Sequence, residues 1–80
     1  SVLFADELDG KVKYVLKDLN KKKLLLKVHP YVSAYLTKGF KSYQNQWFFR
    51  YLKRVKIEAN NSYSFLEYHF FDENLEEIIL

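Results

Sequence analysis

The first stripe of apolar residues along the chain has helical spacing. Its members fall at i, i+4, i+7, i+8 and i+11, which places them on one face of a helix of about three or four turns. They are Leu8, Val12, Val15, Leu16 and Leu19. Asp6 is a suitable N-cap, and the acids Glu7 and Asp9 suit the positive end of the helix dipole. We therefore predict a helix that begins near Asp6 and ends before the lysine run at 21–23.

Two further stripes with helical spacing follow, one on each side of Gly39. Pro30 precedes the first and fits the first turn of a helix, where a missing N–H costs nothing. Gly39 favours the end of that helix, and Ser42 is a suitable N-cap for the next one. The apolar positions are Tyr31, Val32, Tyr35 and Leu36 in the first stripe, and Tyr43, Trp47, Phe48, Tyr51 and Leu52 in the second.

Apolar and polar residues alternate in three other segments, which is typical of strands with one wet face. These segments are 23–29, 54–59 and 66–71, and the tail 75–80 is a short terminal strand or a frayed end. The order α-β-α-α-β-β predicts a single small α+β domain over residues 1–80. Its helices would pack on one face of a three-stranded sheet.

His29 stands beside Pro30 at the junction of the first strand and the second helix. A histidine here could be a catalytic base, a metal ligand or a corner residue, and we favour a corner residue whose ring hydrogen-bonds the backbone at the helix start. A metal cluster of His29, His69 and Asp72 lacks the usual ligand spacing. No paired carboxylates, HExxH pattern or Gly-rich phosphate loop is present. We expect no catalytic residue and no metal site in this chain.

Composition narrows the class of protein. The chain has 80 residues, including seven Phe, seven Tyr and one Trp, which is enough large apolar side chain for a core. The absence of cysteine excludes disulfides and thiolate zinc sites. No segment approaches the roughly 20 apolar residues that span a bilayer, so we expect a cytoplasmic protein. Because methionine is also absent, we expect a piece of a larger protein.

Charge is segregated along the chain. All thirteen Lys and Arg residues lie within 1–56, whereas 57–80 holds six acids and neither Lys nor Arg. A basic half next to an acidic half suggests a dipolar surface with affinity for a polyanion on the basic side. The candidate RNA-binding residues are Lys21, Lys22, Lys23, Lys27, Lys38, Lys41, Arg50, Lys53, Arg54 and Lys56.

Two RNA-binding folds match this pattern in part. A KH-type domain also packs two helices, joined by a loop, against three strands, but the loop LTKGFKS has one glycine where the GXXG clamp needs two. An RRM-type platform would stack bases on strand aromatics, although aromatics with a period of two belong more often to a core. The aromatics in question are Tyr63, Phe65, Tyr68, Phe70 and Phe71. A free-standing basic RNA-binding module of KH-like topology stays open as an alternative.

Three segments together resemble the C-terminal end of the ribonuclease E/G family of endoribonucleases. They read LKVHPYVSAYLTKG, KSYQNQWFFRYLKRVKIEAN and LEYHFFD. The pattern V-x-P-x-V/I-A-x-Y/F-L falls on Val28, Pro30, Val32, Ala34, Tyr35 and Leu36. The opening segment SVLFADELDGKVKYVL is similar to the helix that follows the zinc-link in that family, so the resemblance covers most of the chain.

The resemblance implies a non-catalytic small domain of a ribonuclease G-like enzyme that cleaves single-stranded RNA in RNA processing and decay. In the family, the Mg²⁺-binding carboxylates, the 5′-end sensing pocket and the zinc-link all lie upstream, so none of their residues is transferred to this chain. The implied partners are the rest of its own chain, further copies in a homo-oligomer, and RNA through the parent protein. Apolar surface for partner subunits is expected at Phe40, Trp47, Phe48, Ile78, Ile79 and Leu80.

Overall fold

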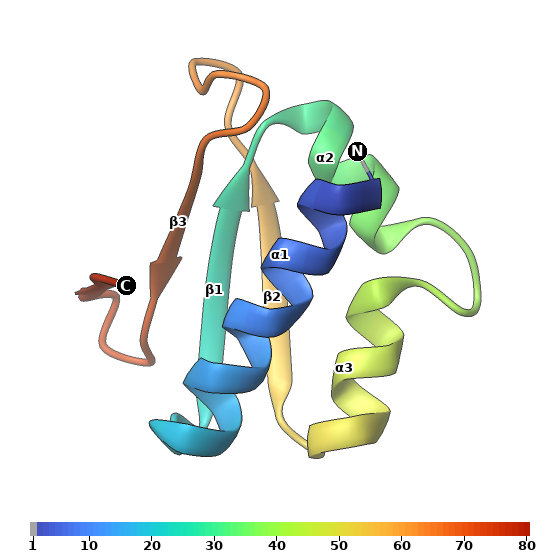
Figure 1. The fold of residues 1–80 in the computed structure, drawn as a ribbon. Helices are drawn as coiled ribbons and strands as arrows, with labels where there is room; N and C mark the ends of the chain where they lie inside the picture. The colour runs from blue at the N-terminus through green and yellow to red at the C-terminus, as the bar shows by residue number, and fades with distance from the viewer. Residues whose placement is uncertain (1) are drawn as a thin grey trace.

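A four-stranded mixed sheet forms the base of the structure, a computed structural model that describes residues 2–80. The strand order is β2-β1-β3-β4, with β1 at Lys23–Val28, β2 at Arg54–Ala59, β3 at Tyr68–Phe71 and β4 at Glu77–Ile78. Strand β1 is parallel to β2 and antiparallel to β3 (Figure 1). The parallel pair requires a crossover, and the two helices between the strands supply it. The tail therefore contributes the short fourth strand.

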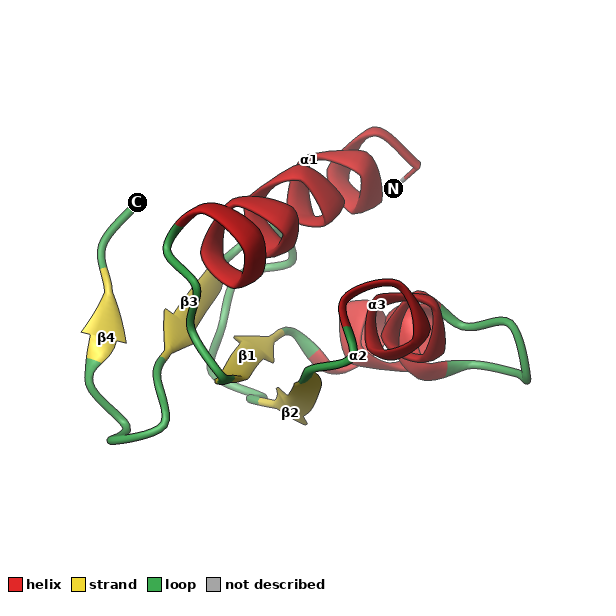
Figure 2. Ribbon diagram, turned by 90° about the horizontal axis from the view of Figure 1, so that it is seen from below, coloured by secondary structure: helices red, strands yellow, loops and turns green. Residues whose placement is uncertain are grey.

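Three helices cover one face of this sheet, as Figure 2 shows. Helix α1 spans Val2–Lys13 and continues into a π-helical turn, η1, at Tyr14–Asp18; α2 spans Pro30–Thr37 and α3 spans Tyr43–Tyr51. Helix α2 contacts β1 and β2, and α3 contacts β2. The opposite face of the sheet carries no helix. The predicted α+β class, with helices on one face, is confirmed.

A single core fills the space between the helices and the sheet. Alternate strand residues point into it, as period-two geometry requires. Its largest fully buried side chains are Trp47 of α3 and Phe70 of β3. The core consists of Leu8, Val12, Val15, Leu16, Leu24, Leu26, Val28, Val32, Leu36, Trp47, Val55 and Phe70. The helical and strand periods in the sequence thus identified most of the buried positions.

The predicted helix starts at His29 and Ser42 are confirmed, whereas Asp6, the other predicted N-cap, lies inside α1. Nδ1 of His29 accepts a hydrogen bond from the Tyr31 N–H at 3.1 Å, and Pro30 occupies the first turn of α2. Ser42 Oγ accepts from the Asn45 N–H at 3.1 Å and is almost fully buried. His29 is therefore a structural corner residue, as its position before Pro30 predicted.

The predicted start of the first helix is wrong, whereas its predicted end before the lysine run at 21–23 is confirmed, since η1 ends at Asp18. The helix begins at Val2, four residues before Asp6, because Phe4 and Ala5 pack inward and extend it upstream. At the other end the Leu19 N–H donates to the Tyr14 carbonyl over five residues, at 3.0 Å. This wider turn rotates Leu19 off the apolar stripe and leaves it 40% exposed.

The predicted strand at 66–71 is shorter than expected at its start. Strand β3 begins at Tyr68, and Leu66 is an exposed loop residue. The Glu67 N–H donates to the Ser64 carbonyl at 3.1 Å, while the Ser64 N–H donates to the Glu67 carboxylate at 3.0 Å. This reciprocal turn uses backbone groups that a longer strand would need for its ladder.

Among residues 2–80 we find no helix with the length and apolar content required to cross a bilayer.

Candidate nucleic-acid interface

A basic groove separates the C-terminal end of the first helix from the C-terminal end of α3. It encloses about 620 Å³ and is lined by Asp9, Lys13, Leu16, Lys17, Asn20, Arg50, Tyr51 and Lys53. Four of these side chains are cationic and one is acidic. The lysines of the first helix were not among the predicted RNA-binding residues, whereas Arg50 and Lys53 were. The groove thus brings together cations of the first helix with Arg50 of α3 and Lys53 just after it, which are distant in the sequence.

Lys53 lines this groove and connects its two sides. Helix α3 ends at Tyr51, and its C-cap residue Leu52 has a left-handed backbone (φ 55°), so Lys53 stands in the short connection to β2. The Lys53 ammonium donates to the Leu16 carbonyl at 2.6 Å and to the Asn20 side-chain oxygen at 2.7 Å. The Leu16 carbonyl lies in the last turn of the first helix, where backbone oxygens lack helical partners and attract cations. Lys53 therefore fastens the two walls together.

Asp9 is the single carboxylate of the groove, and the indole of the buried Trp47 holds it in place. The Trp47 Nε1–H donates to Asp9 Oδ1 at 2.7 Å, and Arg50 Nη1 lies 3.5 Å from the same oxygen. The ion pair is half exposed, so it stabilises the fold only weakly. In the described part of the chain, neither Lys13 nor Lys17 forms an ion pair with an acid. Net positive charge therefore faces the solvent here.

The remaining predicted RNA-binding residues do not join this groove. Lys23, Arg54 and Lys56 line a hollow on the helix-free face of the sheet, but three acids, Glu58, Asp72 and Glu73, line the same hollow. Ion pairs neutralise part of the positive charge on this face. Lys56 Nζ lies 3.4 Å from a carboxylate oxygen of Glu58, and Lys21 Nζ lies 3.8 Å from one of Asp72. Lys27 lies over the Phe71 ring, 5.1 Å from its centroid. Lys22, Lys38 and Lys41 are exposed loop residues.

The predicted apolar interface is divided by the fold. Trp47 is fully buried and cannot belong to it, because its indole fills the core and binds Asp9. Phe40 is 87% exposed and Phe48 is 43% exposed, on the side of the molecule that carries α3. Ile78 packs partly against the core, whereas Ile79 and Leu80 are exposed beside β4, beyond the other edge of the sheet (Figures 1 and 2). Because Phe40 and Phe48 lie on a different side of the molecule from Ile79 and Leu80, a single partner surface cannot contact all of them.

Phe49 is an exposed aromatic residue that was not among the predicted interface residues. It is 70% exposed and lines, with Phe40, a second hollow of about 370 Å³ formed by Phe40, Lys41, Asn45, Gln46, Phe49 and Arg50. Its ring contacts the Phe48 ring edge-on, with centroids 5.5 Å apart. The only sequence signal was the pair of adjacent phenylalanines, of which a helix can bury one at most.

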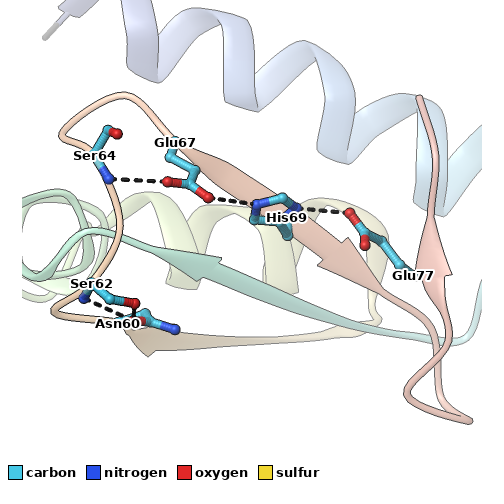
Figure 3. A network of polar contacts seen from close by, with 6 residues as sticks. All are labelled: Asn60, Ser62, Ser64, Glu67, His69 and Glu77. Atoms are coloured by element: carbon cyan, nitrogen blue, oxygen red, sulfur yellow. Dashed lines mark hydrogen bonds and ion pairs between the residues drawn. The ribbon is translucent and has the colours of Figure 1, made fainter.

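His69 lies at the far edge of the sheet between two carboxylates (Figure 3). Its Nε2 is 2.9 Å from Glu67 and its Nδ1 is 2.7 Å from Glu77. A neutral imidazole donates only one hydrogen bond, so the protonated ring fits this arrangement best. Hydrogen bonds with Glu67 and then Glu77 raise the pKa of His69 above 6.5. The His69 hydrogen bond, followed by that of the Ser64 N–H, lowers the pKa of Glu67 below 4.5.

The two carboxylates flank opposite sides of the His69 ring rather than converging on one point. Within residues 2–80, no three His, Cys, Asp or Glu side chains form a group that could hold a metal ion. The alternative cluster of His29, His69 and Asp72 is therefore not assembled. Asp72 instead accepts hydrogen bonds from the N–H groups of Asn74 and Glu76, at 2.9 and 3.0 Å.

Comparisons with protein-family models, curated proteins and solved structures found no match for this chain. The interpretation of the site therefore depends on its geometry and charge.

Proposed function

We propose that this chain is a non-catalytic accessory domain that contacts single-stranded RNA through the basic groove, within a ribonuclease E/G-like endoribonuclease. The observation that carries this proposal is the excess of cations over acids between the first helix and α3. Phosphate contacts by Lys and Arg supply most of the affinity of sequence-independent RNA binding. The enzymatic chemistry and its Mg²⁺ would belong to other parts of the parent protein, as the family resemblance implies.

Two features of the groove favour a polyanion as its ligand. Three of its cations stand on two helices, and the fourth, Lys53, follows α3. The core and the Lys53 hydrogen bonds fix the positions of these helices, so little ordering is needed on binding. Its acid, Asp9, is directed toward the indole N–H of Trp47 and thus has one oxygen already occupied. An extended phosphate backbone can contact several such cations in succession.

A second candidate function is subunit packing in a homo-oligomer. The exposed rings of Phe40 and Phe48 favour it, because exposed apolar surface of this kind often marks protein contacts. In that case the 80-residue chain should form dimers as its concentration rises, as measured by light scattering. A free-standing KH-like module would instead bind RNA at the loop between α2 and α3, which carries Lys38 and Lys41.

The proposed RNA contact is tested by fluorescence anisotropy with a short labelled oligouridine over a range of salt concentrations. The double variant Lys13→Ala/Lys17→Ala removes two groove cations with a substitution that favours helix. We expect weaker binding and a salt dependence, d log K/d log [salt], reduced in magnitude by about 1.4, the value for two lost phosphate contacts on a single strand.

The matched control is Lys22→Ala/Lys38→Ala, which removes the same charge from two exposed residues outside the groove. We expect this variant to keep nearly the original affinity. An equal loss in both variants would mean that binding follows net charge alone. A loss confined to the control would move the contact to the loops, as a KH-like module requires. Either result would contradict a role for the groove.

A further inference from the structure

Arg50 belongs to two neighbouring hollows. It lines the basic groove together with Lys13, Lys17 and Lys53, and it also lines the hollow formed around Phe40 and Phe49. The two hollows therefore form one continuous surface. It has cations on one side of Arg50 and exposed aromatic rings on the other. This combination is the one that proteins use for single-stranded nucleic acid, with phosphates along a positive groove and bases on aromatic side chains.

The loop that carries Phe40 is fastened to α3 rather than loose. The side-chain amide of Asn45 donates to the Phe40 carbonyl at 2.8 Å, and that of Gln46 donates to the Lys41 carbonyl at 2.8 Å. Ser42 caps the helix from the same loop. Phe49 itself stands on α3, one residue before Arg50. Phe49 is thus held on a helix and Phe40 on a loop that is hydrogen-bonded to it, which lowers the entropy lost when a flat ligand is bound between or on the two rings.

We propose that the Phe40–Phe49 hollow stacks one or two bases of the RNA strand whose phosphates occupy the basic groove. This inference rests on the proposed function and adds the class of ligand: an unpaired strand rather than a duplex. Bases in a duplex are stacked on each other and do not present a free face to a side chain. A protein partner at the same rings is the competing occupant, but the adjoining surface has Arg50 and Lys41 and, among its lining residues, no acid. That charge favours a polyanion.

The test compares oligouridine with an abasic ribose-phosphate strand of the same length, by anisotropy against the 80-residue chain. Phe49→Ala should weaken oligouridine binding by about fivefold or more, the range for loss of one base–aromatic stack, and leave the abasic strand unaffected. Phe49→Trp should restore binding because it keeps an aromatic face, and Phe49→Leu should not. The matched control is Tyr31→Ala, since Tyr31 is equally exposed, at 73%, but lines a different hollow with Phe4 and Phe65.

The outcomes separate this inference from the proposed function. If Lys13→Ala/Lys17→Ala weakens both strands and Phe49→Ala weakens neither, the groove contact stands and base stacking is wrong. If Phe49→Leu binds as well as the original chain, the ring acts only as apolar surface and stacking is again contradicted. If Phe49→Ala lowers the mass seen by light scattering without changing RNA affinity, the hollow holds a second copy of the chain. If the unaltered chain binds neither strand, both proposals fail.

Discussion

Asp9 and His69 each have two polar partners, but they lie at opposite sides of the molecule and in opposite electrostatic surroundings. Asp9 is a single acid among four cations in the groove between the first helix and α3. His69 is a single base between Glu67 and Glu77, beside β4 (Figure 3). The groove therefore has more cations than acids, whereas at the β3–β4 edge both ring nitrogens of the protonated histidine are bound by carboxylates.

The difference shows how the segregation of charge along the chain becomes a segregation in space. Residues 57–80 contain six acids and neither Lys nor Arg. Glu58 lies on β2, whereas the other five acids lie in or next to β3 and β4, at the edge of the sheet farthest from α3. Some of these acids have structural partners, as Asp72 does in its turn and Glu67 does in its loop. Among the groove cations, Lys53 and Arg50 have polar partners, whereas Lys13 and Lys17 form no ion pair within residues 2–80. Long-range attraction of a polyanion would therefore be directed toward the helical side of the molecule.

The largest expected effect comes from replacing Trp47, whose buried indole donates a hydrogen bond to Asp9 of the groove. Trp47→Ala would leave a cavity in the core and cost about 3–5 kcal/mol of unfolding free energy. That is a large share of the stability of a small domain. Urea denaturation followed by circular dichroism measures it. Trp47→Phe keeps most of the volume and should cost clearly less, and equal losses in the two variants would contradict the packing role of the indole.

An intermediate effect is expected at Asp9. Asp9→Ala leaves the Trp47 N–H without its acceptor and should cost about 1 kcal/mol, at the low end for such a loss because the site is partly exposed. Asp9→Asn keeps an acceptor oxygen and removes the negative charge. It should retain more of the stability and bind oligouridine more tightly than the original chain, as measured by anisotropy. Unchanged or weaker RNA binding by Asp9→Asn would contradict the groove as the binding site.

The smallest expected effect is the pH dependence of the β3–β4 edge. Because the folded-state pKa of His69 is raised, its contribution to stability is complete below about pH 6.5, its unfolded value, and is lost as pH rises through the folded pKa. The lowered pKa of Glu67 acts in the opposite direction. Its contribution to stability is complete above about pH 4.5 and is lost as pH falls through the folded-state pKa. Two other titratable residues are neighbours of the imidazole. Lys27 is the register partner of His69 on β1, and the centroid of the Tyr63 ring lies 5.1 Å from that of the His69 ring.

Proton NMR titration of the His69 ring measures this pKa directly. We expect a midpoint above 6.5 that falls toward it in Glu67→Gln and in Glu77→Gln. His69→Gln should flatten the change in unfolding free energy between pH 6 and pH 8, because the titrating group is gone. A midpoint at or below 6.5 in the original chain would show that the two carboxylates do not bind the protonated ring.

Local signals in the sequence predicted the parts of the fold that depend on neighbouring residues. His29 before Pro30 and Ser42 before Tyr43 identified two helix starts, because a cap is formed within three residues. The start of α1 was misplaced because Phe4 and Ala5 are held by contacts with distant parts of the chain. Leu19 was assigned to the apolar stripe because a π-helical turn leaves no clear mark in the spacing of residues.

The candidate site was predicted only in part because it is formed by residues distant in the sequence. Arg50 and Lys53 were selected from the basic half of the chain, but Lys13 and Lys17 acquire their role only when the first helix packs beside α3. Trp47 was assigned to a surface because helical spacing gives a stripe without saying which of its members the core covers. Its burial follows from the sheet beneath it and from the bond to Asp9, 38 residues away in the sequence.

The most direct test of the contrast between the two regions is an ¹⁵N–¹H NMR titration of the 80-residue chain with oligouridine. We predict that amide signals of Lys13–Asn20 and Phe49–Lys53 shift with rising RNA concentration, and that those of His69 and Glu77 stay in place. Shifts concentrated on β3, β4 or the helix-free face of the sheet would contradict it, because the RNA would then bind where the acids lie.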